Sequence, residues 1–204
     1  MPLLGGPVSL YRYRVLEARA RSPRAVTQAF QDDAFVPLDR ESGELDRASG
    51  WVALHDPDVR LTPSLVFLGD DAVVSWRVDE ARVPPALVRA ELKAWRASFE
   101  EAKGRPPTRR EASEEKELRL RQLRKQAFVT SKTYDVRWRM DVDELQIWAV
   151  SSRILEEIAV ALEEDLGLVL RPLGPGARWA DGRSAEISPT PSLFGAEVSS
   201  AGIQ

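Results

Sequence analysis

The chain has 204 residues, of which 43% are hydrophobic and 30% charged, a balance typical of a globular protein that buries a core. It has no cysteine and one histidine, His55, which excludes disulfides, thiolate zinc sites and sites built from two imidazoles. We find neither a signal-peptide pattern nor an apolar run near the roughly 20 residues of a membrane-spanning helix, so we expect a cytoplasmic bacterial protein with no membrane partner.

The net charge of −3 conceals an uneven distribution of charge along the chain. Between Arg105 and Arg139, eleven Lys or Arg stand against five Asp or Glu, a net charge of +6, so the remainder carries −9. Such a split is typical of a protein with one cationic face.

The first segment, residues 1–80, is predicted to be β-α-β-β-β. A strand over 8–16 is followed by a helix that begins at Ser22-Pro23, with serine as N-cap and proline at the first helical position. The apolar face of this helix comprises Val26, Ala29 and Phe30. After a polar loop, three further strands are expected over 50–54, 64–68 and 72–78.

Residues 81–130 are predicted to form two antiparallel helices that project from the sheet. Pro84-Pro85 opens the first helix, Gly104 and the prolines after it end that helix, and the second covers about 109–127. The first helix carries a heptad-like apolar seam, formed by Val88, Leu92, Trp95 and Phe99. This seam can pack against the second helix, which is the commoner case, or against a second subunit.

Residues 131–173 are predicted to be β-β-α-β, and 174–204 a flexible tail. In the clearest strand, apolar residues alternate with charged ones, so one face is expected to be buried and the other charged; the charged set is Asp135, Arg137, Arg139 and Asp141. A strand at 145–150, a helix between Ser151 and Gly167 and a return strand at 168–170 follow. The fold class is therefore α+β, with antiparallel sheets, packed helices and a projecting two-helix hairpin.

Catalytic motifs are missing from the sequence: it has no phosphate-binding glycine loop, no Gly-x-Ser-x-Gly elbow and no His-Glu-x-x-His. His55 precedes Asp56-Pro57 and is expected to be an exposed loop residue. Asp70-Asp71 and the cluster at 141–144 could bind Mg²⁺, but both coincide with expected turns, where Asp is a favoured residue. We therefore expect no enzyme activity, no metal and no cofactor.

The basic stretch suggests contacts with nucleic-acid phosphates. Its candidate residues lie on the second hairpin helix and the strand that follows: Arg119, Arg121, Arg124, Lys125, Lys132, Arg137 and Arg139. Phosphate contacts of this kind give affinity without base selection. The alternative is a solvated helix face, on which Glu114, Glu115 and Glu117 pair with some of these cations.

The order of these elements, with certain residues, resembles the RdgC family of bacterial recombination-associated DNA-binding proteins. The matching residues span about 8–173, and they are Phe35-x-Pro37, Gly50-Trp51-Val52, Val83-Pro84, Gly104-Arg105, Glu115-Lys116, Leu123, Ala127-Phe128, Trp138, Ala149-x-Ser151-Ser152, Leu166-Gly167 and Pro172-Leu173.

The resemblance implies a nucleoid-associated homodimer that encloses double-stranded DNA without sequence preference and limits access of the RecA recombinase. Members of the family continue well beyond the equivalent of Pro172, so this chain resembles a shortened member. The alternative is a protein–protein interaction or oligomerisation module on the same scaffold, which uses the hairpin and the C-terminal arm and has lost DNA binding.

Overall fold

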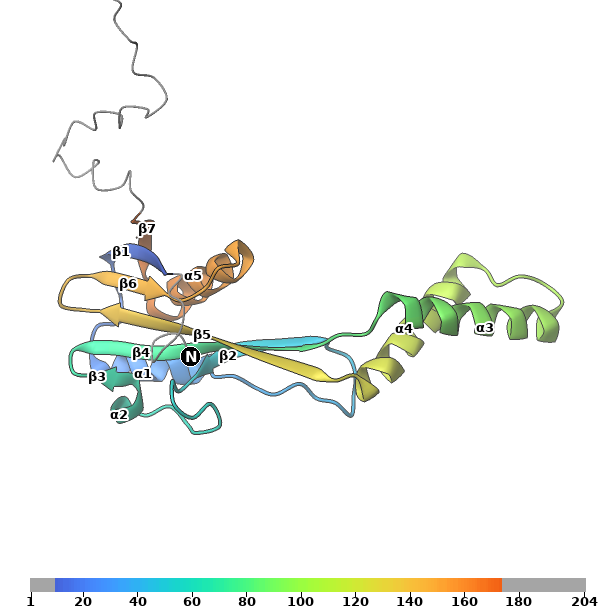
Figure 1. Ribbon diagram of the computed structural model, residues 1–204, viewed down its shortest axis with the longest axis horizontal. Helices are drawn as coiled ribbons and strands as arrows, with labels where there is room; N and C mark the ends of the chain where they lie inside the picture. Colours follow the sequence, from blue (N-terminus) through green and yellow to red (C-terminus); the bar gives the residue numbers. More distant parts are fainter. Residues whose placement is uncertain (1–9, 174–204) are drawn as a thin grey trace, which may run out of the picture. The chain divides into compact units, whose positions relative to one another are not determined.

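The computed structural model describes residues 10–173, which form one seven-stranded antiparallel sheet and five helices (Figure 1). The strands are β1 (Tyr11–Glu17), β2 (Arg47–Val52), β3 (Phe67–Leu68), β4 (Asp71–Ala81), β5 (Val129–Arg139), β6 (Glu144–Ile147) and β7 (Val169–Pro172). The helices are α1 (Pro23–Asp32), α2 (Pro63–Val66), α3 (Pro85–Lys103), α4 (Arg109–Gln126) and α5 (Ser152–Leu166). The α+β class is confirmed; the tail expected over 174–204 lies outside the described residues.

In the sheet, the first strand of the described chain, β1, lies between the last two, β6 and β7. The strand order is β2-β4-β5-β6-β1-β7, with β3 paired to β4. β4 and β5 are the longest strands, with 11 residues each, and they pair from Asp71↔Arg139 to Ala81↔Val129. Helices α3 and α4 connect β4 to β5 at the Ala81–Val129 end of this ladder, and they project beyond the rest of the sheet (Figure 1).

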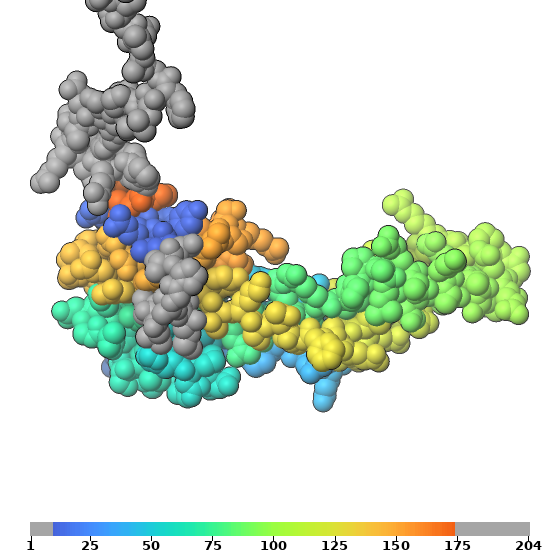
Figure 2. All heavy atoms as spheres, viewed as in Figure 1, coloured from blue at the N-terminus to red at the C-terminus, as the bar shows by residue number. Residues whose placement is uncertain are grey.

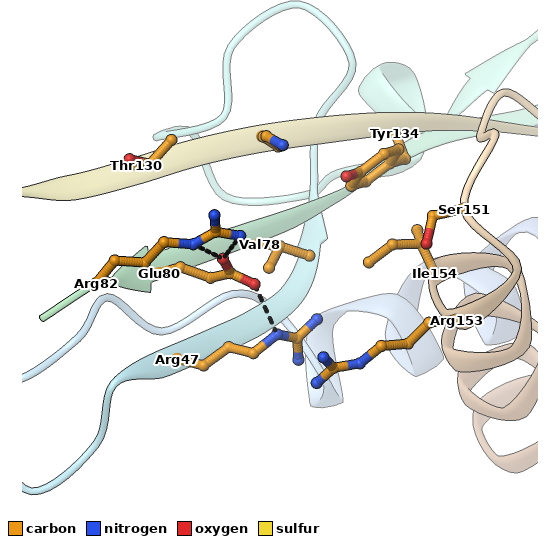
Figure 3. A pocket seen from close by; sticks show the side chains of 10 residues that line it. Arg47, Val78, Glu80, Arg82, Thr130, Tyr134, Ser151, Arg153 and Ile154 are labelled. Atoms are coloured by element: carbon orange, nitrogen blue, oxygen red, sulfur yellow. Dashed lines mark hydrogen bonds and ion pairs between the residues drawn. The ribbon is translucent and has the colours of Figure 1, made fainter. Parts of the chain in front are cut away.

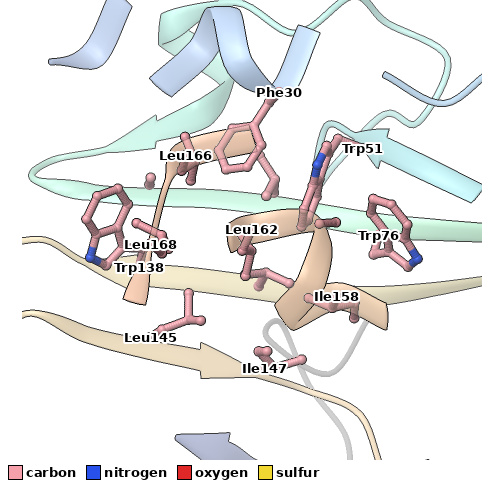
Figure 4. Packing of buried hydrophobic residues seen from close by; sticks show 14 of the residues in the cluster. Phe30, Trp51, Trp76, Trp138, Leu145, Ile147, Ile158, Leu162, Leu166 and Leu168 are labelled. Atoms are coloured by element: carbon pink, nitrogen blue, oxygen red, sulfur yellow. The ribbon is translucent and has the colours of Figure 1, made fainter. Parts of the chain in front are cut away.

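One face of the sheet carries the core. Side chains alternate along a strand, so Trp76, Val136 and Trp138 share a face with Trp51, which is paired with Trp76. Helices α1 and α5 cover this face (Figure 4). The ring centroids of Phe30 and Trp51 lie 4.9 Å apart and those of Trp51 and Trp76 lie 4.6 Å apart. Burying each large apolar side chain of this kind stabilises the fold by about 1.5–3 kcal/mol.

The helix ends follow local sequence signals. Ser22 accepts a hydrogen bond from the backbone N–H of Ala25, and Gly104 and Gly167 end α3 and α5 in the left-handed conformation. At the start of α4, Thr108 and Glu111 form a reciprocal capping box, which was not predicted from the sequence. The elbow of the hairpin is therefore fixed by backbone hydrogen bonds on both sides.

Two predictions about strands are wrong. Residues 64–68 are not a strand: Pro63 starts the short helix α2, and β3 contributes only Phe67 and Leu68. Thr62-Pro63 is a helix-start signal that the short apolar run concealed. Asp135 does not lie on an exposed charged face, because it is fully buried and accepts a 2.8 Å hydrogen bond from Ser75 Oγ.

Candidate nucleic-acid interface

The hairpin helices α3 and α4 lie side by side (Figure 2). Within the seam of α3, Val88 is buried, whereas Leu92, Trp95 and Phe99 remain partly exposed. The rings of Trp95 and Phe99 are 5.2 Å apart, and the guanidinium of Arg105 lies 5.3 Å from the Phe99 ring. The seam therefore keeps apolar surface accessible on the isolated chain.

Most of the expected cations on α4 are paired with carboxylates. Arg119 Nε lies 2.7 Å from Glu115 Oε1, and its Nη1 lies 3.5 Å from Glu91 Oε2 on α3. Arg121 approaches Glu44 more loosely, at 3.8 Å. The Arg119–Glu115 pair is of the i,i+4 type that the solvated-face alternative predicts.

The loop 39–46 lies along α4 and binds it through backbone groups. Arg124 donates a 2.9 Å hydrogen bond to the Glu44 carbonyl and pairs with Asp46 at 3.1 Å, so only 17% of its side chain is exposed. A Cβ on Gly43 would lie 2.4 Å from the carbonyl oxygen of Arg121, so the loop and the helix are in direct contact. Lys125 is exposed and forms no ion pair within the described residues.

The expected cations on β5 divide between the two faces of the sheet. Arg137 pairs with Asp71, and Arg139 lies 3.6 Å from Asp141. Because side chains alternate, Lys132 lies on the other face, which it shares with Trp138. Lys132 is exposed and makes no ion pair with any described residue. The structure therefore does not bring all seven candidate cations to one surface.

A hollow of about 270 Å³ opens on the core face of the sheet, next to the first turn of α5 (Figure 3). It is lined by four cations, one carboxylate and five other residues that include Thr130, Tyr134 and Ser151; the cations are Arg47, Arg82, Lys132 and Arg153. Arg47, Arg82 and Arg153 were not predicted from the sequence. They come from separate segments, which only the register of β2, β4 and β5 and the position of α5 bring together.

Two of these arginines are held by acidic partners. Arg47 Nη2 donates hydrogen bonds to both carboxylate oxygens of Glu157, at 2.8 and 2.6 Å, and Trp76 Nε1 donates a third to this carboxylate at 3.1 Å. Burial raises the pKa of Glu157, but the hydrogen bonds from Arg47 and Trp76 outweigh this effect and lower its pKa overall. Arg82 pairs with Glu80 at 2.6 Å. Arg153, in contrast, is exposed and has no ion-pair partner among residues 10–173.

The acidic clusters have structural partners. Asp143, with φ of 51°, forms the turn between β5 and β6 and pairs with Arg21 at 2.8 Å, while Asp71 pairs with Arg137. His55 is an exposed loop residue, as predicted. Within residues 10–173, no three histidine or acidic side chains are grouped so as to hold a metal ion. In the same range, no helix combines the length and apolarity needed to cross a bilayer.

A family model described as "Putative exonuclease, RdgC" matches residues 8–177. The chain belongs to the RdgC family. A search of curated proteins finds no match to the sequence. The RdgC match includes all seven strands and all five helices of the described chain, and therefore also the hairpin and the cationic hollow. The family resemblance inferred from the sequence is confirmed.

Proposed function

We propose that this RdgC-family chain binds double-stranded DNA through its phosphate backbone, without sequence preference and without cleaving it. Membership of the family is the observation that carries the proposal. In the proposed role the protein acts as a nucleoid-associated homodimer and limits access of the RecA recombinase to the DNA. Contacts to phosphate require cations and hydrogen-bond donors but no catalytic group.

The proposed phosphate contacts are those expected from the sequence, and they differ in availability: Arg119, Arg121, Arg124, Lys125, Lys132, Arg137 and Arg139. Lys125 and Lys132 are exposed and have no ion-pair partner among the described residues. Arg121 and Arg139 are in long pairs of 3.8 and 3.6 Å. Exposed pairs of this kind contribute about 0–1 kcal/mol, so a phosphate can displace the carboxylate at little cost. The other three are held by shorter contacts, so they contribute mainly to the surrounding potential.

The proposed dimer contact uses the seam of α3, formed by Val88, Leu92, Trp95 and Phe99. Partly exposed aromatic side chains in adjacent turns are suited to an interface, because they bury a large area at low entropic cost. Val88 is already buried within the chain, so the contact would centre on the other three residues.

Fluorescence anisotropy with a short labelled duplex of random sequence tests the proposed DNA binding. We expect the logarithm of the binding constant to fall linearly with the logarithm of the salt concentration, with a slope of about −0.9 for each phosphate contacted. Lys125→Glu should weaken binding and reduce this slope. Lys116→Glu, the same charge change at another exposed position of α4, is the matched control and should have less effect.

A wild-type chain that does not bind the duplex, or binds it without salt dependence, would refute the proposed function. Equal losses in the Lys125 and Lys116 variants would instead refute the assignment of Lys125 as a specific contact. Because the matching family model is described as an exonuclease, the same duplex is incubated with Mg²⁺. Shortening of the DNA would show that the chain is an enzyme after all.

A protein–protein interaction module on the same scaffold is the second candidate. Two observations favour it: five of the seven candidate cations pair with carboxylates, and Leu92, Trp95 and Phe99 keep exposed apolar surface. This alternative predicts a dimer or larger assembly by light scattering and no salt-dependent DNA binding. Both proposals predict that Trp95→Ala reduces the measured mass, so the DNA titration is the experiment that separates the DNA-binding protein from the interaction module.

A further inference from the structure

The hollow beside α5 gathers positive charge that its own carboxylate does not balance. Four cationic side chains and one carboxylate, Glu80, line it, a net charge of +3, which falls to +2 when Glu157, the partner of Arg47, is counted as well. Arg47 reaches it from β2, Arg82 from the position just after β4 and Lys132 from β5, while Arg153 comes from the first turn of α5. In Figure 3 the guanidinium groups of Arg153 and Arg47 extend toward each other.

The cations are partly prearranged by their neighbours. Glu157 fixes Arg47 through both carboxylate oxygens, and Glu80 holds Arg82 at the rim. Lys132 and Arg153 supply unpaired charge, because neither has an ion-pair partner among the described residues. Glu80 lies between Arg82 and Arg47, with Arg47 Nε 3.8 Å from its carboxylate, whereas no carboxylate of the described residues pairs with Lys132 or Arg153. An anion bound beside these two side chains would offset their repulsion.

Neutral hydrogen-bond donors also line the hollow. Thr130 and Ser151 bring hydroxyl groups, and Tyr134 brings a phenol. Burial, together with the charge of Glu80, raises the pKa of Tyr134, so the phenol stays protonated and can donate a hydrogen bond. Arginine forks and hydroxyl groups are the donors that proteins use for the oxygens of phosphate.

We propose that this hollow binds a phosphate group, held by Arg47, Arg82, Lys132 and Arg153. Its volume of about 270 Å³ is below the roughly 300–1,000 Å³ of pockets for drug-sized ligands, and its aliphatic lining is limited to Val78 and Ile154. The phosphate comes either from a DNA strand or from a small phosphorylated compound. Where it comes from DNA, the inference rests on the proposed function and adds contacts that the basic stretch alone does not contain.

Isothermal titration calorimetry of the full chain with inorganic pyrophosphate tests the site directly. The variant combines Arg153→Gln and Lys132→Gln, because these exposed, unpaired side chains can be changed without breaking a contact within the fold. Lys116→Gln, on α4 and outside the hollow, is the control. We expect the double variant to bind pyrophosphate about tenfold more weakly or worse, since each charged contact contributes strongly, and the control to bind as the wild type does.

Unchanged pyrophosphate affinity in the double variant, or no binding by the wild type, overturns the inference. The anisotropy experiment on duplex DNA then identifies the source of the phosphate. A chain that binds pyrophosphate but not the duplex retains the site for small phosphorylated compounds, and the proposed function fails. A chain that binds the duplex equally well with and without the double substitution, and does not bind pyrophosphate, retains the proposed function without Lys132 as a contact and loses the site.

Discussion

Replacing Gly43 by alanine tests the contact between the loop 39–46 and α4. Gly43 has φ of 63°, and its Cβ would lie 2.4 Å from the carbonyl oxygen of Arg121. Gly69 has almost the same φ, 64°, but a Cβ there meets nothing within 4 Å. Gly69→Ala therefore carries only the cost of the left-handed backbone, whereas Gly43→Ala carries this cost and that of a collision.

The backbone cost is about 1–2 kcal/mol for a residue with a Cβ. The collision involves a backbone atom, so no side-chain rotation relieves it and the loop must move away from the helix. Arg124 then loses its 2.9 Å hydrogen bond to the Glu44 carbonyl, and its pair with Asp46 is weakened. A hydrogen bond from a charged donor contributes about 1.5–3 kcal/mol. We therefore expect Gly43→Ala to lower the free energy of unfolding by about 2 kcal/mol more than Gly69→Ala.

Urea unfolding, followed by tryptophan fluorescence, measures both variants, since Trp51 and Trp76 are buried in the core. Hydrogen exchange of the loop amides gives a local readout, and only Gly43→Ala should accelerate it. Equal losses of stability in the two variants, with unchanged exchange in the loop, would show that the loop does not lie against α4 as described.

Three further outcomes are expected. Trp138→Ala should lower the free energy of unfolding by about 3–5 kcal/mol in urea titrations, because its buried indole leaves a cavity. Burial raises the pKa of Asp165, although Trp51 donates a hydrogen bond to it. Ionisation of Asp165 therefore lowers the free energy of unfolding as the pH rises through its folded-state pKa. Asp165→Asn should raise the melting temperature at neutral pH, but not at a pH below the ordinary pKa of aspartate, where the carboxyl is protonated in both states. Thr108→Ala removes the N-cap of α4, at a cost of about 1 kcal/mol in helix stability. In an NMR titration it should also raise the pKa of Glu111 from about 2, because one of the hydrogen bonds that lower it is lost.

The hairpin and the helix ends were predictable because their signals are local. Pro84-Pro85, Gly104 and Gly167 each restrict the backbone at their own position, whatever the rest of the chain does. The alternation in β5 likewise located Val136 and Trp138 in the core. A short apolar run lacks such information, which is why 64–68 was assigned to a strand.

Which of the cations are paired with carboxylates was not predictable, since the pairing depends on contacts between distant segments. Carboxylates from outside the basic stretch, such as Glu44, Asp46 and Asp71, neutralise much of its charge. The net −9 of the remaining chain was the one sign of this in the sequence, but it does not say which residues meet. The arginines around the phosphate site are separated by long stretches of chain, so periodicity within any one segment could not reveal them.

The pairing of Ala81 with Val129 determines how the helical hairpin is connected to the sheet. The chain leaves the sheet at one rung of the β4–β5 ladder and returns at the same rung, so the whole of α3 and α4 is an insertion into a β-hairpin. Whole helical turns can be added or removed near the elbow without shifting a hydrogen bond of the sheet or the contact between Arg124 and the loop 39–46. The reach of this arm is thus free to vary independently of the core that carries it.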